Sequence, residues 1–316
     1  MPADCVIGVD LGGTKLLAGV VDADLRVHHR AFRPAPTNGV LDTLEAIARE
    51  LIAASEAPIV GIGMGIPSLM DHARGVAMWT NHLDLEGVAV ADLLAERLDL
   101  PVKIDNDCNA AMLAEHAGGA AQGAANAVMV TIGTGIGGAI VAGGRLVRGA
   151  HGAAGELGHI VVDKDGPPCP GNCPNRGCLE AVASGTALAV EGDHIAATDR
   201  DSALARESAA GRPITGALVT ELAHDGDPGA VKAVARIGRN LGVGLASIAN
   251  ALDPEVIVVG GGVIAAGELL LGPAREELAA RALPPIAANV RVVASRFGAE
   301  SGMLGAAVMA FEGVAA

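Results

Sequence analysis

The sequence predicts an α/β protein with two lobes and a cleft between them. Its 316 residues are enough for two lobes of ordinary size. Aromatic residues make up only 1% of the chain and glycine supplies 44 residues. The core must therefore be built from Ala, Val, Leu and Ile at close backbone approach, which suits layered α/β packing. A strand, a turn of glycine and threonine and a second strand also occur twice, about a domain length apart, which indicates a duplicated lobe.

The first copy of this pattern lies near the N-terminus. An apolar strand is expected at residues 5–10 and ends at Asp10, and apolar character resumes at residues 16–21 and again at 25–30. The intervening turn contains Gly12, Gly13, Thr14 and Lys15. Backbone N–H groups of such a turn can bind a phosphate, with Asp10 facing the metal ion bound to it. A plain hairpin with glycine at positive φ is the alternative, and the first copy alone favours it.

The second copy shifts the balance toward phosphate binding. Residues 127–132 predict a strand, and Gly133, Thr134 and Gly135 open the turn that follows. A phosphate between two facing turns is the simplest explanation of the duplication. Residues 133–138 also fit the dinucleotide-binding pattern G-x-G-x-x-G, but that pattern requires a helix next. Here four apolar residues run into a second glycine pair, as in a hairpin, so a Rossmann site is disfavoured.

Between the two copies, the periodicity predicts helices at residues 39–54 and 88–98 and strands at 59–66 and 102–104. The last strand leads to Asp105, Asn106, Asp107, Cys108 and Asn109, which begin an alanine-rich helix. A carboxylate at this position, Asp107, is kept ionised by the helix dipole. N-capping by one Asp or Asn is expected here as well. Four polar residues in five nevertheless exceed what a cap needs.

Residues 151–180 contain the strongest local signal. Between residues 166 and 177 the only apolar side chains are prolines and cysteines, so little surface can be buried and no regular element is expected. Cys169, Cys173 and Cys178 with His159 form a set suited to tetrahedral, structural Zn²⁺. A surface loop with unligated cysteines is the alternative. Glu156 and Glu180 flank the set and could accept hydrogen bonds from a polyhydroxylated ligand, or could be solvated surface charges.

The C-terminal half continues the α/β pattern. Helices are expected at residues 180–190, 231–252, 266–281 and 301–311, and strands at 255–259 and 290–295, with an uninformative helical stretch at 193–230. Gly261 and Gly262 lie in a glycine-rich turn between a strand and a helix. Such turns are where nucleotides bind in open α/β sheets.

Bulk properties restrict the function further. The net charge of −14 argues against a general grip on nucleic acid, which needs Lys and Arg. The sequence has no run of about 18 apolar residues, so no membrane span is expected, and no signal peptide is expected before the first strand. Five cysteines, three of them in the predicted metal cluster, suit a reducing compartment and predict a cytoplasmic location.

Several motifs together make the chain similar to the ROK family of bacterial sugar kinases and repressors, in the superfamily that joins actin, hexokinase and the heat-shock chaperone ATPases. The resemblance covers nearly the whole chain. Its motifs lie at residues 10–15, 105–109, 133–138, 155–159 and 260–262 and in the cysteine cluster with Glu180. Each motif alone is weak, and only their combination is specific.

The resemblance implies two actin-like, ribonuclease H-like lobes with sugar and ATP in the central cleft. The small lobe would comprise residues 1–106 and be completed by the C-terminal helix 301–316, and the large lobe would comprise residues 107–300. It also implies an ATP-dependent hexose kinase acting at the 6-hydroxyl, with glucose as the commonest substrate. Family members are often dimers or tetramers, so a homodimer or homotetramer is expected.

The same resemblance implies roles for individual residues. Asp107 would be the catalytic base, and the sugar hydroxyls would be bound by Asn106, Glu156, His159 and Glu180. Asp10, acting through Mg²⁺, and the turns at residues 12–15 and 134–135 would bind the phosphates of ATP. Gly261 and Gly262 would bind the adenosine.

Two departures from the family pattern affect these expectations. Cys169 and Cys173 enclose three residues where the family usually has one, so the two extra residues either loop out or remove a ligand. Ser68 stands where the family commonly has a glycine near the sugar, so its side chain could narrow or re-aim the pocket.

Other functions stay open at this point. A kinase for N-acetylmannosamine, N-acetylglucosamine or fructose, or one that uses polyphosphate, is the alternative within enzymes. A sugar-responsive repressor is the alternative outside them, although the first phosphate motif begins at Asp10 and no DNA-reading segment is expected before it. A sugar sensor without catalysis is a third alternative, against which Asp107 argues.

Overall fold

The computed structural model describes residues 4–36, 38–80 and 83–315. The chain divides into two compact units. Unit 1 comprises residues 1–123, 139–155 and 295–316, and unit 2 comprises residues 124–138 and 156–294. Helix α3, which begins at Asp107, belongs to unit 1.

Unit 1 is built on a mixed five-stranded sheet in the order β3-β2-β1-β4-β7. Its strands are β1 (Cys5–Leu11), β2 (Lys15–Val21), β3 (Val27–Pro34), β4 (Ile59–Ile66) and β7 (Val102–Asn106). β1, β4 and β7 run parallel, with Asp10 paired to Gly65 and Gly65 paired to Asp105. The carboxyl ends of β1 and β7 therefore meet at one edge of the sheet, which brings Asp10 into register with the polar segment that starts α3.

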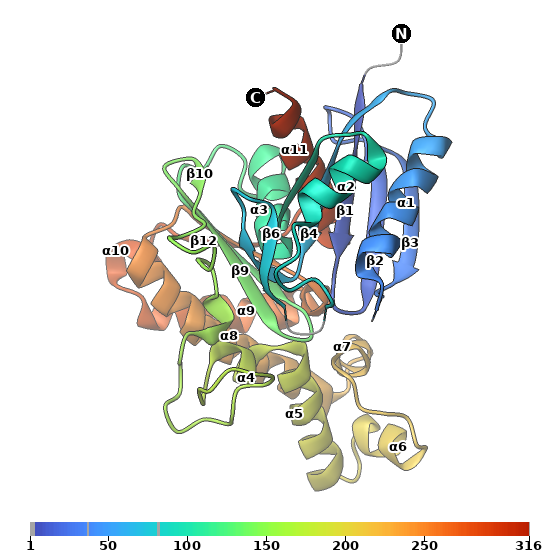
Figure 1. Ribbon diagram of the computed structural model, residues 1–316. Coiled ribbons are helices and arrows are strands. Elements are labelled where there is room, and N and C mark those ends of the chain that lie inside the picture. Colours follow the sequence, from blue (N-terminus) through green and yellow to red (C-terminus); the bar gives the residue numbers. More distant parts are fainter. Residues whose placement is uncertain (1–3, 37, 81–82, 316) are drawn as a thin grey trace. The chain divides into compact units, whose positions relative to one another are not determined.

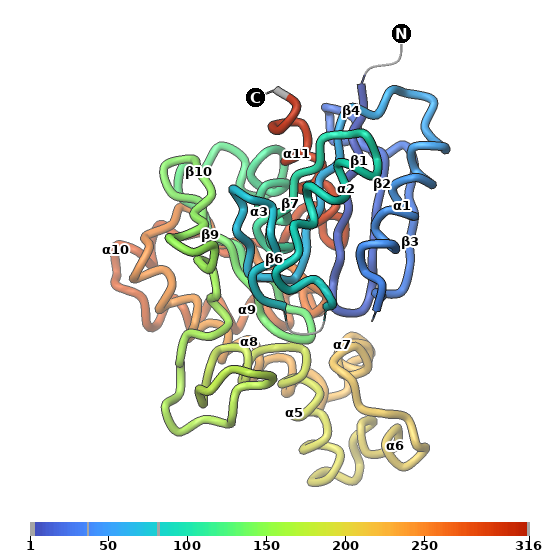
Figure 2. Tube along the Cα trace, in the orientation of Figure 1, coloured from blue at the N-terminus to red at the C-terminus, as the bar shows by residue number. Residues whose placement is uncertain are grey.

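Four main helices cover this sheet: α1 (Val40–Ala54), α2 (Val90–Leu98), α3 (Asp107–Gly118) and α11 (Ser301–Ala315). α11 packs on α3, β1 and β4, so the C-terminal segment returns to unit 1, as the resemblance implied (Figures 1 and 2). This approach is close because two strand glycines face α11. A Cβ atom on Gly8 would lie 2.1 Å from the Met303 carbonyl oxygen, and one on Gly63 would lie 1.8 Å from that of Ala306.

A short hairpin of β5 (Ser68–Asp71) and β6 (Val76–Thr80) follows β4 and was not expected from the sequence. Its strands, SLMD and VAMWT, do not alternate strictly between apolar and polar residues, so no strand period marks them. Met70 and Ala77 anchor it in the core, whereas Met78 and Trp79 are exposed.

Unit 2 contains the parallel strands β8 (Ala127–Ile132), β11 (Val256–Gly260) and β12 (Arg291–Ala294). They belong to a second five-stranded sheet in the order β10-β9-β8-β11-β12, whose other strands are β9 (Ile136–Ala142) and β10 (Arg145–Leu146). The hairpin β8–β9 repeats the hairpin β1–β2, so the α/β class and the duplicated hairpins predicted from the sequence are both confirmed.

The helices of unit 2 are α4 (Leu179–Ala183), α5 (Gly185–Thr198), α6 (Ala203–Ala209), α7 (Gly216–His224), α8 (Pro228–Leu252), α9 (Glu268–Arg281) and α10 (Pro284–Ala287). The helix expected at 180–190 is wrong in its continuity, because it breaks at Ser184. This residue is extended, and its hydroxyl accepts the Ala187 N–H as the cap of α5. α8 begins three residues before the expected start, since Asp227 caps it and Pro228 fits the first helical position.

Helices α8 and α9 pack closely in unit 2 (Figure 1). Gly238 and Gly242 permit this, because Cβ atoms there would lie 2.4 and 2.5 Å from carbonyl oxygens of α9. Across the described ranges of the chain, no helix is both long enough and apolar enough to cross a membrane.

Candidate active site and metal centre

Asn106 and Asp107 lie where β7 passes into α3. The Asn106 side-chain oxygen accepts the backbone N–H groups of Cys108 (2.9 Å) and Asn109 (3.2 Å), so Asn106 is the N-cap expected in this segment. Its amide nitrogen donates to the Ser68 carbonyl at 3.3 Å. Asp107 is the first helical residue, and its carboxylate accepts the Cys108 N–H at 3.0 Å. The Asp107 carboxylate thus lies at the N-terminus of α3, where backbone N–H groups can face an anion.

A buried carboxylate that sequence reasoning left without a role, Asp105, holds this turn. One of its oxygens accepts the Asn106 N–H at 2.8 Å and the Asn109 side-chain amide at 2.9 Å. The other accepts Arg148 Nε at 2.7 Å and lies 3.5 Å from His72 Nδ1. Only 1% of Asp105 is exposed, so the ion pair with Arg148 compensates its charge. The signal was the first acidic residue of the motif at 105–109, but nothing in the sequence pointed to its distant partners.

Asp10 lies at the end of β1, with its carboxylate against the first turn of α11. A Cβ atom on Gly302 would lie 2.4 Å from the Asp10 carboxyl carbon, so a side chain there would displace the carboxylate. Burial and the neighbouring Asp107 carboxylate raise the pKa of Asp10 to about 7, although Lys15 opposes the shift. The negative charges of Asp10 and Asp107 repel each other, and a bound divalent cation would reduce this repulsion.

The turn that follows Asp10 closes through the Gly12 N–H, which donates to the Lys15 carbonyl at 2.8 Å. Gly13, Thr14 and Lys15 are exposed, and a Cβ atom on Gly13 would meet no atom within 4 Å. This turn is therefore open to a ligand, as a phosphate-binding turn must be.

Ser68 is buried, with 5% of its surface exposed, and its hydroxyl lies 2.9 Å from the carbonyl oxygens of both Leu69 and Trp79. The hydroxyl therefore serves the β5–β6 hairpin, and the Ser68 carbonyl holds the Asn106 amide. This arrangement explains how a serine is accommodated at this position.

The second turn, in unit 2, closes through the Gly133 N–H, which donates to the Gly135 carbonyl at 2.9 Å. Thr134 at its tip is exposed. The third glycine turn follows β11. Gly261 has φ +83°, and a Cβ atom there would lie 2.4 Å from the Ile132 carbonyl oxygen, whereas one on Gly262 would meet nothing within 4 Å. Gly261 is thus required by the fold, and Gly262 presents exposed backbone.

The predicted zinc ligands come together. The ligand atoms of His159, Cys169, Cys173 and Cys178 all lie within 4.8 Å of one another. Cys169 Sγ is 3.5 Å from His159 Nδ1, and Cys173 Sγ is 3.9 Å from Cys178 Sγ. In a tetrahedral site, zinc–ligand bonds separate two sulfurs by about 3.8 Å and a sulfur from a nitrogen by about 3.5 Å. The four residues therefore fit a structural Zn²⁺.

The enlarged cysteine spacing loops out. Gly171, between Cys169 and Cys173, has φ +70°, and a Cβ atom on it would meet nothing within 4 Å. The backbone turns there without displacing either sulfur, so the insertion keeps the ligand set together.

Two glutamate side chains lie beside this metal centre. His159 directs Nδ1 toward the cysteines, and its Nε2 lies 3.9 Å from the Glu156 carboxylate. A metal ion on Nδ1 would leave the Nε2–H as a donor beside that carboxylate. Partial burial and the Glu180 carboxylate raise the pKa of Glu156, whereas His159 lowers it. Glu180 has another partner, since its Oε2 accepts the Ile136 N–H at 2.7 Å.

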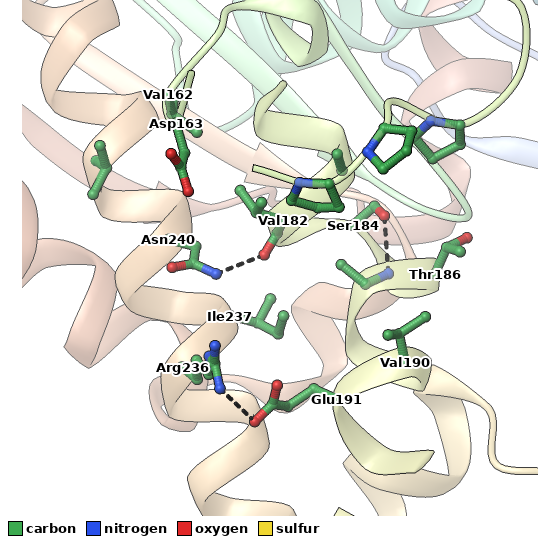
Figure 3. A pocket seen from close by; sticks show the side chains of 16 residues that line it. Val162, Asp163, Val182, Ser184, Thr186, Val190, Glu191, Arg236, Ile237 and Asn240 are labelled. Carbon is green, nitrogen blue, oxygen red and sulfur yellow. Dashed lines mark hydrogen bonds and ion pairs between the residues drawn. The ribbon is translucent and has the colours of Figure 1, made fainter. Parts of the chain in front are cut away.

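A cavity of about 460 Å³ lies between the loop at residues 162–170, helix α5 and helix α8 (Figure 3). Val162, Val182, Val190 and Ile237 give it apolar walls, and an ion pair of Arg236 with Glu191 lies at one side. The residues predicted to bind sugar, nucleotide or zinc do not line it. The cavity is therefore not the predicted sugar, nucleotide or zinc site.

Comparisons with known proteins agree with these motifs. A glucokinase of Thermotoga maritima is 36% identical over 312 residues, which are 97% of each chain. A solved ROK family glucokinase from Streptomyces griseus, in complex with glucose and AMPPNP, is 33% identical with a TM-score of 0.88, and the match covers 98% of this chain and 99% of that one. A xylose repressor of Bacillus spizizenii is 28% identical, over 97% of this chain and 77% of the repressor. ROK family similarity extends from residue 6 to residue 312, and the chain therefore belongs to the ROK family.

Proposed function

We propose that the chain is an ATP-dependent glucokinase that phosphorylates the 6-hydroxyl of glucose. The observation that carries this proposal is the near-full-length similarity to glucokinases, one of them solved with glucose and an ATP analogue. The geometry of each unit supports it, since unit 1 holds a carboxylate at a helix N-terminus beside Asp10 and unit 2 holds the open glycine turns.

Asp107 is the proposed general base. Phosphoryl transfer depends mainly on positioning and charge neutralisation, and a carboxylate that accepts the hydroxyl proton assists the attack. Asn106 caps α3 and so fixes the direction in which Asp107 points. Asp105 and Arg148 hold that cap in place from beneath.

The donor side would use the exposed turns. The backbone at residues 12–15, 133–135 and 261–262 would bind the phosphates and adenosine, and Asp10 would hold Mg²⁺ through water. Mg²⁺, when bound with ATP, would neutralise phosphate charge. Glu156, His159 and Glu180 would orient the sugar hydroxyls, and Ser68 would act at the sugar site through Asn106.

The remaining expectations belong to the same proposal. The lobe boundaries at residues 1–106 with 301–316 and at 107–300, a cytoplasmic location and a homodimer or homotetramer all stay predictions. Size-exclusion chromatography with light scattering measures the last of these directly.

Substitution of Asp107 by asparagine tests the proposed base. We expect kcat for glucose to fall by about 10²- to 10⁴-fold, because asparagine cannot take the proton, while glucose still binds. Asp24→Asn is the matched control, since Asp24 is an exposed carboxylate of unit 1 whose side chain is 73% accessible. Formation of sugar phosphate is measured with ATP and with polyphosphate, over glucose, fructose, N-acetylglucosamine and N-acetylmannosamine. Near-wild-type turnover of the Asp107 variant would remove Asp107 from the mechanism.

The sugar panel also separates the second candidate function, a sugar-responsive regulator, which the similarity to a xylose repressor favours. A wild-type protein that binds a sugar but phosphorylates none of the panel would be a sensor. Preference for another sugar would keep the kinase and change its substrate.

A further inference from the structure

We propose that the zinc centre holds the phosphate-binding turn of unit 2 in place through Glu180, so that the metal supports nucleotide binding. This inference rests on the proposed function of the turn at residues 133–135. It assigns to Glu180 a positioning role in addition to the sugar contact that the family resemblance implied.

The first link is the Glu180 carboxylate. Its Oε2 accepts the Ile136 N–H at 2.7 Å, immediately after the turn. A Cβ atom on Gly135 would lie 2.2 Å from the same oxygen, so a side chain at residue 135 would displace the carboxylate from its present position. A charged acceptor on a backbone N–H makes a strong hydrogen bond, which fixes the backbone at this point.

The second link comes from the first residues of α5. The Gly185 N–H donates to the Gly133 carbonyl at 2.8 Å, and the Thr186 hydroxyl donates to the Thr134 carbonyl at 2.8 Å. Helices α4 and α5 together thus hold three of the four residues from 133 to 136.

The third link is the turn that carries His159. A Cβ atom on Gly158 would lie 2.1 Å from the Ile136 carbonyl oxygen, so this turn also packs directly on the same peptide. Ile136 is therefore held at its N–H by Glu180 and approached at its carbonyl by Gly158. The two segments are joined to each other, because the Leu179 N–H donates to the Ile160 carbonyl at 2.9 Å.

Both holding residues lie next to zinc ligands. Gly158 precedes His159, and Glu180 follows Cys178 by two residues. α4 has only five residues, which is too short to be stable alone, and the cysteine loop buries little apolar surface. Leu179 is buried against α8, and Asn240 of α8 donates to the Val182 carbonyl at 2.8 Å. Ligation of His159 and Cys178 by the metal would add to these contacts and restrain both segments, and with them the phosphate turn.

Substitutions of Glu180 test this role with the zinc-loaded protein. The affinity for the Mg²⁺ complex of AMPPNP is measured by calorimetry without sugar, and zinc is quantified in each sample. We expect Glu180→Ala to keep its zinc and to bind the analogue about ten- to a hundredfold more weakly. Glu180→Gln, which keeps an acceptor for the Ile136 N–H, should stay within about threefold of the wild type. Glu191→Gln is the control, since Glu191 lies on α5 and pairs with Arg236.

Two further measurements make the outcome decisive. The wild-type protein is stripped of zinc, and far-UV circular dichroism is used to check that it stays folded. Its affinity for the analogue should then fall by about the same factor as that of Glu180→Ala. Hydrogen exchange at residues 133–138 should become faster both in the stripped protein and in Glu180→Ala. Unchanged analogue affinity in zinc-loaded Glu180→Ala, or in stripped wild type, overturns the proposal. If the zinc-loaded wild type does not bind the analogue, the proposed nucleotide role of the turn is wrong. Unchanged hydrogen exchange at residues 133–138 in Glu180→Ala and in the stripped protein would separately show that Glu180 and zinc do not hold the turn.

Discussion

At the scale of single residues, the sheet edge in unit 1 places the Asp10 carboxylate in a largely buried position beside a second carboxylate, Asp107. The Asp10 carboxylate lies against Gly302 of α11, and its pKa of about 7 reflects burial first and the Asp107 carboxylate second. Such a site is strained without its ligand, because ionising Asp10 adds a second negative charge beside the proposed base. The same strain favours a cation, so affinity for the Mg²⁺–phosphate pair is gained at the expense of apoprotein stability.

Replacing Asp10 by asparagine should therefore stabilise the nucleotide-free and Mg²⁺-free protein in a pH-dependent way. Since the folded pKa is raised, the carboxyl group's contribution to stability is fully present below about pH 4 and is lost as pH rises through about 7. We expect Asp10→Asn to exceed the wild type by on the order of 2–4 kcal/mol in free energy of unfolding at pH 8, and by much less at pH 5.

Urea unfolding at the two pH values measures this difference, in buffer without a chelator so that any zinc is kept. Asp24→Asn, at an exposed carboxylate, should show no such gain. An equal gain for Asp10→Asn at both pH values would mean that the carboxyl group does not titrate between them. The Asp10 variant should also lose kinase activity, because it no longer supports Mg²⁺.

At the scale of elements, the packing of α11 depends on glycine in the strands beneath it. A Cβ atom on Gly63 would lie 1.8 Å from a backbone oxygen of α11, and backbone cannot move aside as a flexible side chain can. α11 also supplies Gly302, against which the Asp10 carboxylate lies. A displaced α11 would therefore disturb both the fold of unit 1 and its candidate site.

We expect Gly63→Ala to lower the free energy of unfolding by about 3 kcal/mol or more, because overpacking at a rigid contact cannot relax. Gly272→Ala is the matched control, since Gly272 lies inside α9 and a Cβ atom there would meet nothing within 4 Å. The control should be neutral or gain about 0.5–1 kcal/mol, as expected for alanine inside a helix. Chemical denaturation of the two variants checks the contrast, which would be contradicted by equal effects.

Much of this architecture could be predicted from the sequence, because strands such as β4 and β8 and the helix α1 have strong local patterns. The cap at Asn106 and the gathering of the zinc ligands also followed from residue type and spacing. The hairpin β5–β6 could not be predicted, because its strands do not alternate strictly between apolar and polar residues. The break at Ser184 could not be predicted for a different reason. A serine occurs both as a helix cap and inside a helix, so the residue type alone does not mark the break.

Long-range contacts were beyond sequence reasoning altogether. Arg148 and His72 reach Asp105 from distant segments, and no local pattern links an isolated arginine to a carboxylate 43 residues away. The sequence predicted a polyhydroxylated ligand or solvent as the partner of Glu180, whereas its carboxylate contacts the Ile136 N–H and Cys169 Sγ. The type of a functional residue is therefore easier to predict than its partner.

At the scale of the whole molecule, both units have buried apolar cores, but one segment of unit 2 depends on a different source of stability. Unit 1 has an apolar core of residues from β1, β2, β4, α1 and α2, with a second cluster under α11. In unit 2, the segment from residue 159 to 178 is rich in proline and glycine, and its strand pairing consists of two isolated bridges within the segment, Val161–Cys178 and Pro168–Arg176. Metal ligation is the remaining source of order for this segment.

Removal of zinc should therefore act locally. We expect chelation to release one zinc per chain and to speed backbone hydrogen exchange at residues 156–183 by about tenfold or more, because local opening becomes less costly. β1 and β4 should keep their protection, since apolar packing holds them. Exchange measured by mass spectrometry, with zinc re-addition as the reversal control, resolves the two regions. Equal deprotection in both regions would show that the metal supports the whole chain, and no change in residues 156–183 would show that the loop holds itself without it.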